Sequence, residues 1–278
     1  MHNKNEVLVM PGVYDALTAK IAQHVGFKAI FQTGYGTSAS MLAMPDFGFL
    51  SMTETLETAR RITRAVDIPL IVDVDTGYGN PLTVWKLVND LQKIGAAGIF
   101  LEDQVWPKRC GHMAGKDVVA TEEYIPKLKS AIDASRNNPD FIVVARTDAI
   151  APLGIEEAVK RGKRYQEVGA DAVFIEAPHT LDDLKYISSE IDAPLVANMI
   201  EEGVTPNLAS KDLLKMGYQI ALFPLSGLYS STFAIYNTFK TLKEEGTTKP
   251  LVHNMVKFKE FNKLVDLDKY MDMERKYV

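Results

Sequence analysis

Short apolar runs alternate with stretches of helical periodicity along most of the chain. The runs are hydrophobic nearly throughout, which is typical of parallel strands buried on both faces. We predict eight strands, at residues 7–10, 29–32, 70–74, 97–101, 141–145, 172–175, 194–197 and 219–223. Each strand precedes a predicted helix, at residues 14–25, 53–66, 82–94, 121–135, 155–168, 181–191, 210–216 and 228–243.

Eight strand–helix repeats predict a (β/α)8 barrel of the TIM type. Several helices end in a glycine that directly precedes the next apolar run, at Gly26, Gly95 and Gly169. A doubly wound open sheet is the alternative. It is disfavoured because the loops after the predicted strands show no dinucleotide-binding fingerprint. Residues 33–36, within the loop of small residues expected at 33–38, are too few for one. We assign residues 1–245 to one barrel domain.

The remaining residues, 246–278, have no strand to cover. Apolar side chains recur among them with helical spacing, at Met255, Phe258, Phe261, Leu264 and Val265. An amphipathic helix is stable when its apolar side packs on another surface. We therefore predict a C-terminal helical extension that packs on a neighbouring subunit.

The composition is that of a soluble globular protein, with 46% hydrophobic and 24% charged residues. A net charge of −5 argues against a nucleic-acid-binding protein, which would present a basic face. No apolar run approaches the roughly 20 residues of a membrane-spanning helix, and the first residues lack a signal-peptide pattern. We expect a cytoplasmic enzyme with a small-molecule substrate and no membrane or nucleic-acid partner.

Polar residues gather where the predicted strands end. In a barrel of this kind the carboxyl ends of the strands meet at one face and carry the catalytic groups. The set comprises Thr33 and Gly34, Asp73 and Asp75, Glu102 and Asp103, Arg146 and Asp148, Glu176, and Asn198. Any one of them could be a helix cap or a solvated acid, but together they predict an active site.

Asp73 and Asp75 lie two positions apart on a predicted strand, so their side chains point to the same side. Two adjacent carboxylates repel each other unless a cation lies between them. With Glu102 they form the oxygen-rich set that Mg²⁺ or Mn²⁺ prefers. Zinc is disfavoured, because only Cys110 and His112 offer softer ligands and both lie in a loop that contains glycine.

The loop after the fourth strand concentrates reactive groups, namely Lys108, Arg109, Cys110, Gly111 and His112. Cys110 is the only cysteine of the chain, and neighbouring cations lower the pKa of a thiol. The segment is either a gate that carries a functional thiol or a solvated basic loop with an incidental cysteine.

Arg146 follows the fifth strand and would face the acidic strand ends. Its guanidinium is suited to a bidentate contact with a substrate carboxylate. An internal ion pair with Glu176 or Asp148 is the alternative, and the two roles are compatible.

These motifs together resemble the isocitrate lyase/phosphoenolpyruvate mutase superfamily, over about residues 10–243. The matching segments are T-G-Y at 33–35, P-D-F-G at 45–48, D-V-D-T-G-Y-G at 73–79, E-D-Q at 102–104, K-R-C-G-H at 108–112, R-T-D at 146–148 and T-P at 205–206. The cysteine-containing segment is similar to that of the carbon–carbon lyase branch. The resemblance implies a Mg²⁺-dependent enzyme, commonly a homotetramer in which a C-terminal helix is exchanged between paired barrels.

The resemblance also implies a role for each matching residue. Four would form the metal site, with Asp75 as the direct ligand and three residues acting through water, namely Asp73, Asp46 and Glu102. Substrate carboxylates and oxygens would be bound by Thr33, Gly34, Tyr35, Gly111, Arg146 and Asn198. The catalytic groups would be Cys110, which protonates the carbanion formed on cleavage, and Lys108, His112, Arg146 and Glu176.

The implied reaction cleaves a 2-hydroxy di- or tricarboxylate, of the 2-methylisocitrate or 2,3-dimethylmalate type, into pyruvate and a second carboxylate. Tyr229 stands where lyases of tricarboxylates have an arginine, which favours a dicarboxylate, and Pro224 argues against oxaloacetate hydrolysis. Phe31 leaves the base for the hydroxyl open. Alternatives are an oxaloacetate hydrolase or decarboxylase, a carboxyphosphonoenolpyruvate phosphonomutase-like enzyme, and a non-catalytic barrel that acts in binding or assembly.

Overall fold

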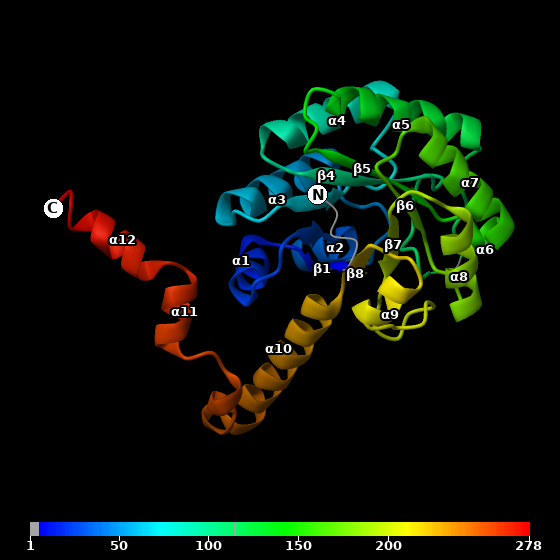
Figure 1. The fold of residues 1–278 in the computed structure, drawn as a ribbon. Coiled ribbons are helices and arrows are strands. Elements are labelled where there is room, and N and C mark those ends of the chain that lie inside the picture. The colour runs from blue at the N-terminus through cyan, green and yellow to red at the C-terminus, as the bar shows by residue number, and fades with distance from the viewer. Residues whose placement is uncertain (1–5, 114) are drawn as a thin grey trace.

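The computed structural model describes residues 6–113 and 115–278, which form a closed barrel of parallel strands (Figure 1). The strands pair in sequence order, and β8 closes on β1. They are β1 Leu8–Val13, β2 Ile30–Gln32, β3 Leu70–Asp73, β4 Gly98–Glu102, β5 Ile142–Thr147, β6 Ala172–Ile175, β7 Leu195–Asn198 and β8 Ile220–Phe223. The predicted (β/α)8 architecture is confirmed.

Eight helices that follow strands agree with the predicted ones to within a few residues: α1 Ala16–Val25, α3 Met52–Ala65, α4 Pro81–Lys93, α5 Thr121–Ser135, α7 Ile155–Val168, α8 Leu181–Glu190, α9 Ser210–Lys215 and α10 Ser226–Glu245. Two more, α2 Gly34–Leu42 and α6 Ile150–Leu153, were not predicted. The expectation of a loop at 33–38 is wrong, because Thr33 caps α2 by accepting a hydrogen bond from the N–H of Gly36 at 3.2 Å. Small residues of low helix propensity concealed this helix.

An apolar layer fills the inside of the barrel. Every strand contributes to it, and the members nearest the carboxyl ends of the strands are Met10, Phe31, Ile71, Phe100, Val144, Phe174, Val196 and Leu222. Phe100 packs edge-on against Phe31 and Phe174, with ring centroids 4.9 and 5.9 Å apart. Side chains alternate along a strand, so the residue two positions after a member of this layer also points inward. Those positions hold Thr33, Asp73, Glu102, Arg146, Glu176 and Asn198.

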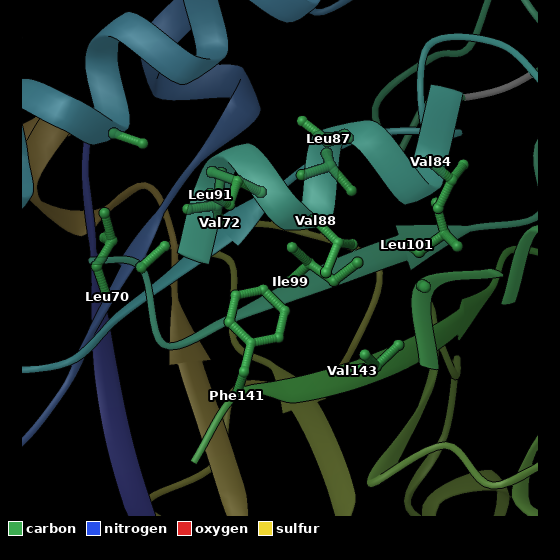
Figure 2. Close-up of a cluster of buried hydrophobic side chains, with 14 of the residues drawn as sticks. Leu70, Val72, Val84, Leu87, Val88, Leu91, Ile99, Leu101, Phe141 and Val143 are labelled. Carbon is green, nitrogen blue, oxygen red and sulfur yellow. The ribbon is translucent and has the colours of Figure 1, made fainter. Parts of the chain in front are cut away.

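A second apolar layer lies between the strands and the surrounding helices (Figure 2). In it, Val72 of β3 and Ile99 of β4 pack with Leu87, Val88 and Leu91 of α4, and all five side chains are fully buried. Burial of each such side chain stabilises the fold by about 1.5–3 kcal/mol. Strands held on both faces in this way give the residues at their ends a fixed framework.

The C-terminal part of the chain leaves the barrel (Figure 1). Helix α10 Ser226–Glu245 has no buried residue, and its Phe233 and Phe239 are 73% and 65% exposed. It is followed by η1 Lys249–Asn254, α11 Phe258–Leu264 and α12 Leu267–Glu274. The predicted helical extension is therefore present, but the departure from the barrel begins at α10. No helix among the described residues is long and apolar enough to cross a membrane.

Asp103 joins the end of β4 to the helical layer. Its carboxylate accepts hydrogen bonds from Thr147 Oγ1 at 2.7 Å, the Tyr165 hydroxyl at 2.8 Å, Arg161 Nη1 at 2.9 Å and the N–H of Asp148 at 3.0 Å. The side chain is fully buried. Asp103 therefore points away from the barrel interior and has a structural role, whereas its neighbour Glu102 points inward.

We expect Asp103→Ala to lower the free energy of unfolding by roughly 3–5 kcal/mol, because it leaves the buried Arg161 guanidinium without its carboxylate. Urea unfolding followed by circular dichroism measures this. The exposed Asp140 provides a control, since Asp140→Ala should change the same quantity by no more than about 0.5 kcal/mol. A loss below about 1 kcal/mol for Asp103→Ala would show that Asp103 does not hold this junction.

Candidate active site

The carboxyl ends of the strands surround a cavity of about 40 Å³. Nine of the predicted site residues line it, namely Thr33, Tyr35, Asp46, Asp73, Cys110, Gly111, Arg146, Glu176 and Asn198. Phe31, Phe174 and Leu222 of the inner apolar layer form its floor. On this measure a water molecule needs roughly 10–15 Å³, so the site has room for only a few water molecules. We expect the loop that covers it to move when a substrate enters.

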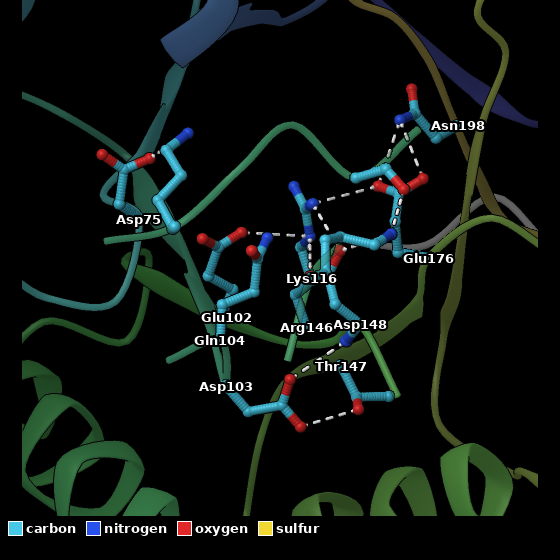
Figure 3. Close-up of polar contacts among 12 residues, drawn as sticks. Asp75, Glu102, Asp103, Gln104, Lys116, Arg146, Thr147, Asp148, Glu176 and Asn198 are labelled. Carbon is cyan, nitrogen blue, oxygen red and sulfur yellow. Dashed lines mark hydrogen bonds and ion pairs between the residues drawn. The ribbon is translucent and has the colours of Figure 1, made fainter. Parts of the chain in front are cut away.

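Arg146 lies at the centre of an ionic network (Figure 3). Its Nε and Nη2 atoms donate to Asp148 at 2.8 and 3.0 Å. Nε is also 3.3 Å from Glu102 Oε2, and Nη2 is 3.4 Å from Glu176 Oε2. The guanidinium carbon lies 5.2 Å from the centre of the Phe174 ring. The internal ion pairs proposed as the alternative role of Arg146 are therefore present, and they use two of its three nitrogens.

Lys108 provides the cation between the aspartates. Its ammonium lies 2.5 Å from Asp46 Oδ1 and 2.6 Å from Asp75 Oδ1, and it is almost completely buried. Asp73 Oδ1 accepts a hydrogen bond from the N–H of Asp75 at 3.1 Å. Burial raises the pKa of Asp75, and the charge of Lys108 opposes this increase. A Cβ atom on Gly34 would lie 3.0 Å from Asp73 Oδ2, so glycine allows α2 to approach this group closely.

The same carboxylates fit a hydrated divalent ion better than a fully dehydrated one. No three of the Asp, Glu, His and Cys side chains among the described residues converge closely enough to chelate a metal together. The Oε1 atom of Glu102 is nevertheless buried without a hydrogen-bond partner. Mg²⁺ typically keeps several water molecules and binds one or two carboxylates directly. The acids here lie around the same part of the site but do not converge on one position, which suits binding through the water molecules of such an ion.

Cys110 lies over the cavity, where its N–H donates to the carbonyl of Asp46 at 3.2 Å. Burial, followed by the negative charge of Asp46, raises the pKa of the thiol to about 11. The prediction of a lowered pKa is wrong, because the neighbouring cations have other partners. Lys108 pairs with the aspartates, and the Arg109 guanidinium lies 5.5 Å from the centre of the Phe47 ring. The thiol is therefore protonated at neutral pH.

His112 reaches back from the loop to the sixth strand. Its Nδ1 accepts a hydrogen bond from the N–H of Val204 at 2.9 Å, and its Nε2 lies 2.9 Å from Glu176 Oε1. Because Nδ1 accepts, the hydrogen-bond network assigns the proton of a neutral ring to Nε2, facing Glu176. Burial would raise the pKa of Glu176, but Arg146 and His112 together hold it below its usual value. Asn198 Nδ2 also donates to Glu176, at 3.2 and 3.3 Å.

A second cavity, of about 280 Å³, adjoins the first at Cys110 and Tyr35. Glu201 lies on its wall, where one carboxylate oxygen accepts a hydrogen bond from Ser226 Oγ and the other, Oε2, is buried without a partner. Burial and the neighbouring Tyr35 raise the pKa of Tyr229, on the same wall, to about 12. The lining of this cavity therefore holds two carboxyl side chains, Glu201 and Glu202, beside a phenol, and no lysine or arginine among the residues that the structure describes.

No role was predicted for three residues here, namely Gln104, which lies in the matching E-D-Q segment, Lys116 and Glu201. Gln104 makes two hydrogen bonds to the backbone of Arg109, at 2.8 and 3.0 Å, and so fixes the start of the loop. Lys116 is buried against Asp148. A lysine next to a loop glycine such as Gly115 is usually exposed to solvent, so no role was predicted for Lys116. Glu201 lies three residues after the end of a strand, where the alternation of side chains no longer predicts which way a side chain points.

Two comparisons place this geometry among known proteins. The family model for phosphoenolpyruvate phosphomutase matches residues 1–230. The chain is 44% identical to 2,3-dimethylmalate lyase of Eubacterium barkeri, across 98% of this chain and 94% of the relative. It is 48% identical to a chloroplastic carboxyvinyl-carboxyphosphonate phosphorylmutase of Arabidopsis thaliana, across 98% and 81%.

Solved structures show the same architecture. Oxaloacetate acetylhydrolase in complex with 3,3-difluorooxalacetate superposes with a TM-score of 0.93 at 33% identity, across 98% of this chain and 93% of the other. Phosphonopyruvate hydrolase in complex with oxalate and Mg²⁺ superposes with a TM-score of 0.87 at 32% identity, across 98% and 94%. The extent of these matches shows that the chain belongs to the phosphoenolpyruvate phosphomutase family, within the isocitrate lyase superfamily.

Proposed function

We propose that the protein is a Mg²⁺-dependent lyase that cleaves a 2-hydroxy dicarboxylate of the 2,3-dimethylmalate type into pyruvate and a monocarboxylate. The observation that carries the proposal is the position of the Cys110 thiol, which lies over the cavity that Arg146 and the acidic residues surround and whose pKa is raised by burial. A reaction that leaves a carbanion needs a proton donor at this place, and a thiol of high pKa holds its proton until a strong base forms.

Substrate binding falls to the residues at the ends of β2, β5 and β7. The pyruvate half would bind at the start of α2, where the N–H groups of Gly34 and Tyr35 have no partner within the helix and the Thr33 hydroxyl can donate. The contacts of Arg146 use Nε and Nη2, which leaves Nη1 for a substrate oxygen. Asn198 Oδ1 is buried without a partner and would accept the hydroxyl of the substrate.

The metal would bind next to these residues. Asp75 would be its direct ligand, and Asp46, Asp73 and Glu102 would act through water molecules. When bound, the ion supplies Lewis-acid stabilisation to the hydroxyl and carboxylate oxygens of the substrate. Positive charge from Arg146 and Lys108 adds to the same effect in a site that excludes water.

Cleavage then proceeds without change in the total number of protons. The hydroxyl proton leaves to a base, the bond between C2 and C3 breaks, and C2 becomes the carbonyl carbon of pyruvate. The electron pair of the broken bond stays on C3, next to the second carboxylate. Cys110 donates its thiol proton to C3, while Lys108, Gly111 and His112 hold the loop closed around it.

The second cavity supports a dicarboxylate as substrate. A third carboxylate placed there would meet the unpaired oxygen of Glu201, and no lysine or arginine of the described part of the chain lines the cavity. Ile200, Met113 and Leu225 line the same space and would contact an alkyl group. The wall thus favours an uncharged substituent on the substrate.

A panel of acids with product identification by mass spectrometry tests the proposed function. With Mg²⁺ we expect pyruvate and propionate from 2,3-dimethylmalate, and at least about tenfold lower kcat/KM for 2-methylisocitrate and isocitrate, equivalent to about 1.4 kcal/mol of discrimination. EDTA should abolish turnover and added Mg²⁺ restore it. The proposal would be overturned if the main activity were formation of acetate and oxalate from oxaloacetate, the reaction of an oxaloacetate acetylhydrolase. Conversion of phosphonopyruvate as the main activity, the reaction of a phosphonopyruvate hydrolase, would also overturn it. No product from any acid would favour a non-catalytic barrel.

We expect Cys110→Ser to reduce kcat by about 10²–10⁴-fold, the usual contribution of a general acid. The serine hydroxyl is a much weaker acid than the thiol but of similar size. Affinity for oxalate in the presence of Mg²⁺, measured by calorimetry, should stay within about threefold of the wild-type value. Retention of wild-type kcat would exclude Cys110 as the proton donor.

We also propose that α10 and the following extension pack on a second copy of the chain, within a homotetramer. The exposed side chains of Phe233, Tyr236 and Phe239 form one apolar helix surface, and Leu17 and Ile21 of α1 are exposed on the barrel. Exposed apolar surface of this extent marks a site of protein association.

We expect Phe239→Glu to convert the assembly to monomers, as measured by size-exclusion chromatography with light scattering, because the charge would be buried at the interface. Leu82→Glu, at a site on α4 that is 76% exposed, introduces the same charge on the barrel and should leave the mass unchanged. A wild-type protein that is monomeric at micromolar concentration would contradict the proposed exchange.

A further inference from the structure

Lys116 is a buried lysine to which the reaction assigns no role. It ends the loop over the active site, and only 9% of its surface is exposed. Its ammonium donates a hydrogen bond to the carbonyl of Gly111 and lies 3.4 Å from Asp148 Oδ1 (Figure 3). One cation therefore contacts both the segment next to Cys110 and the end of β5.

Asp148 is a fixed attachment point. It accepts two hydrogen bonds from Arg146, at 2.8 and 3.0 Å, and its N–H donates to Asp103 at 3.0 Å. Both its side chain and its backbone are thus held by buried groups of the barrel. A contact from Lys116 to Asp148 joins the loop to this rigid part of the protein.

Gly111 brings the loop into contact with the substrate-binding pair. A Cβ atom at this position would lie 2.5 Å from Glu176 Cγ and 2.6 Å from Arg146 Nη2, so the backbone of Gly111 rests directly on both side chains. The neighbouring Cys110 is positioned by the same contact. Whatever holds the carbonyl of Gly111 in place therefore also holds the thiol over the cavity.

A purely structural role for Lys116 is the alternative, since a buried ion pair can stabilise a fold or be neutral to it. The position of the contacts argues against that role. Lys116 donates to the carbonyl of Gly111, which rests on Arg146 and Glu176, and its second partner, Asp148, is itself bound to Arg146. Both contacts of Lys116 therefore lie beside the arginine of the active site.

We propose that Lys116 is a positioning residue that latches the Cys110 loop to Asp148 in the closed arrangement, so that the thiol reaches the substrate only while the latch is engaged. The effect on turnover rests on the function proposed above, whereas the effect on the accessibility of the thiol does not. A charge-assisted hydrogen bond of this kind raises the fraction of molecules in which the loop is closed, while Lys116 itself takes no part in the chemical step.

The single cysteine of the chain provides a direct measurement of the latch. Iodoacetamide alkylation of Cys110, followed by intact mass spectrometry, reports how often the loop opens. We expect Lys116→Met to be alkylated at least about tenfold faster than wild type, and Lys116→Arg, which keeps the charge, to be closer to wild type. Oxalate with Mg²⁺ should protect the wild-type thiol more than that of Lys116→Met.

Lys127→Met is the matched control. Lys127 is also partly buried and donates to a backbone carbonyl, that of Thr76 at 3.2 Å, but it makes no contact with residues 108–113. Its alkylation rate should stay within about twofold of wild type. Lys116→Gln, which keeps a donor for Gly111 but loses the attraction to Asp148, serves as the second variant if Lys116→Met does not fold, and its rate should be intermediate.

Steady-state kinetics then distinguish a role of Lys116 in positioning the loop from a role in the stability of the fold. We expect Lys116→Met to lower kcat by about tenfold or more with KM changed less than about threefold, and Lys116→Arg to recover part of kcat. Alkylation of Lys116→Met or Lys116→Gln at the wild-type rate would overturn the latch. Faster alkylation in a protein that converts none of the acids tested would contradict the proposed reaction and leave the latch supported.

Discussion

The compensation of buried negative charge is the interaction on which the rest of the site depends. The strand ends place several carboxylates against apolar walls, where an unpaired ion costs several kcal/mol. Arg146 offsets part of this charge from within the barrel. Lys108 and Lys116 offset a further part of it, and both belong to the loop over the cavity. Closure of the loop therefore brings two of the compensating charges to the site, and a bound divalent cation would add to them.

The inner apolar layer decides where this charge is placed. Phe31, Phe100 and Phe174 close the barrel beneath the site, and alternation along the strands puts a polar side chain two positions beyond each of them. Water is thus excluded from below by packed rings and from above by the loop. Electrostatic interactions in such a site are stronger than at the surface, which suits a reaction that develops charge on the substrate oxygens and on carbon.

The environment of Cys110 shows how tertiary structure reverses a local expectation. Its sequence neighbours are cations, which by themselves would lower the pKa of a thiol. In the folded protein these cations bind Asp46, Asp75 and the Phe47 ring, and burial raises the pKa instead. The thiol therefore holds its proton more tightly in the folded protein than its sequence neighbours predict.

The barrel and the inward-facing residues at its strand ends can be predicted from local patterns, because the strand period fixes which residues lie inside and the carboxyl ends of parallel strands meet at one face. Asp73, Glu102 and Arg146 follow from that rule. The helix after Thr33, the direction of Glu201, the burial of Lys116 and the partner of each charge could not be predicted in this way. These depend on contacts between segments far apart in the sequence, which no local pattern of residue types encodes.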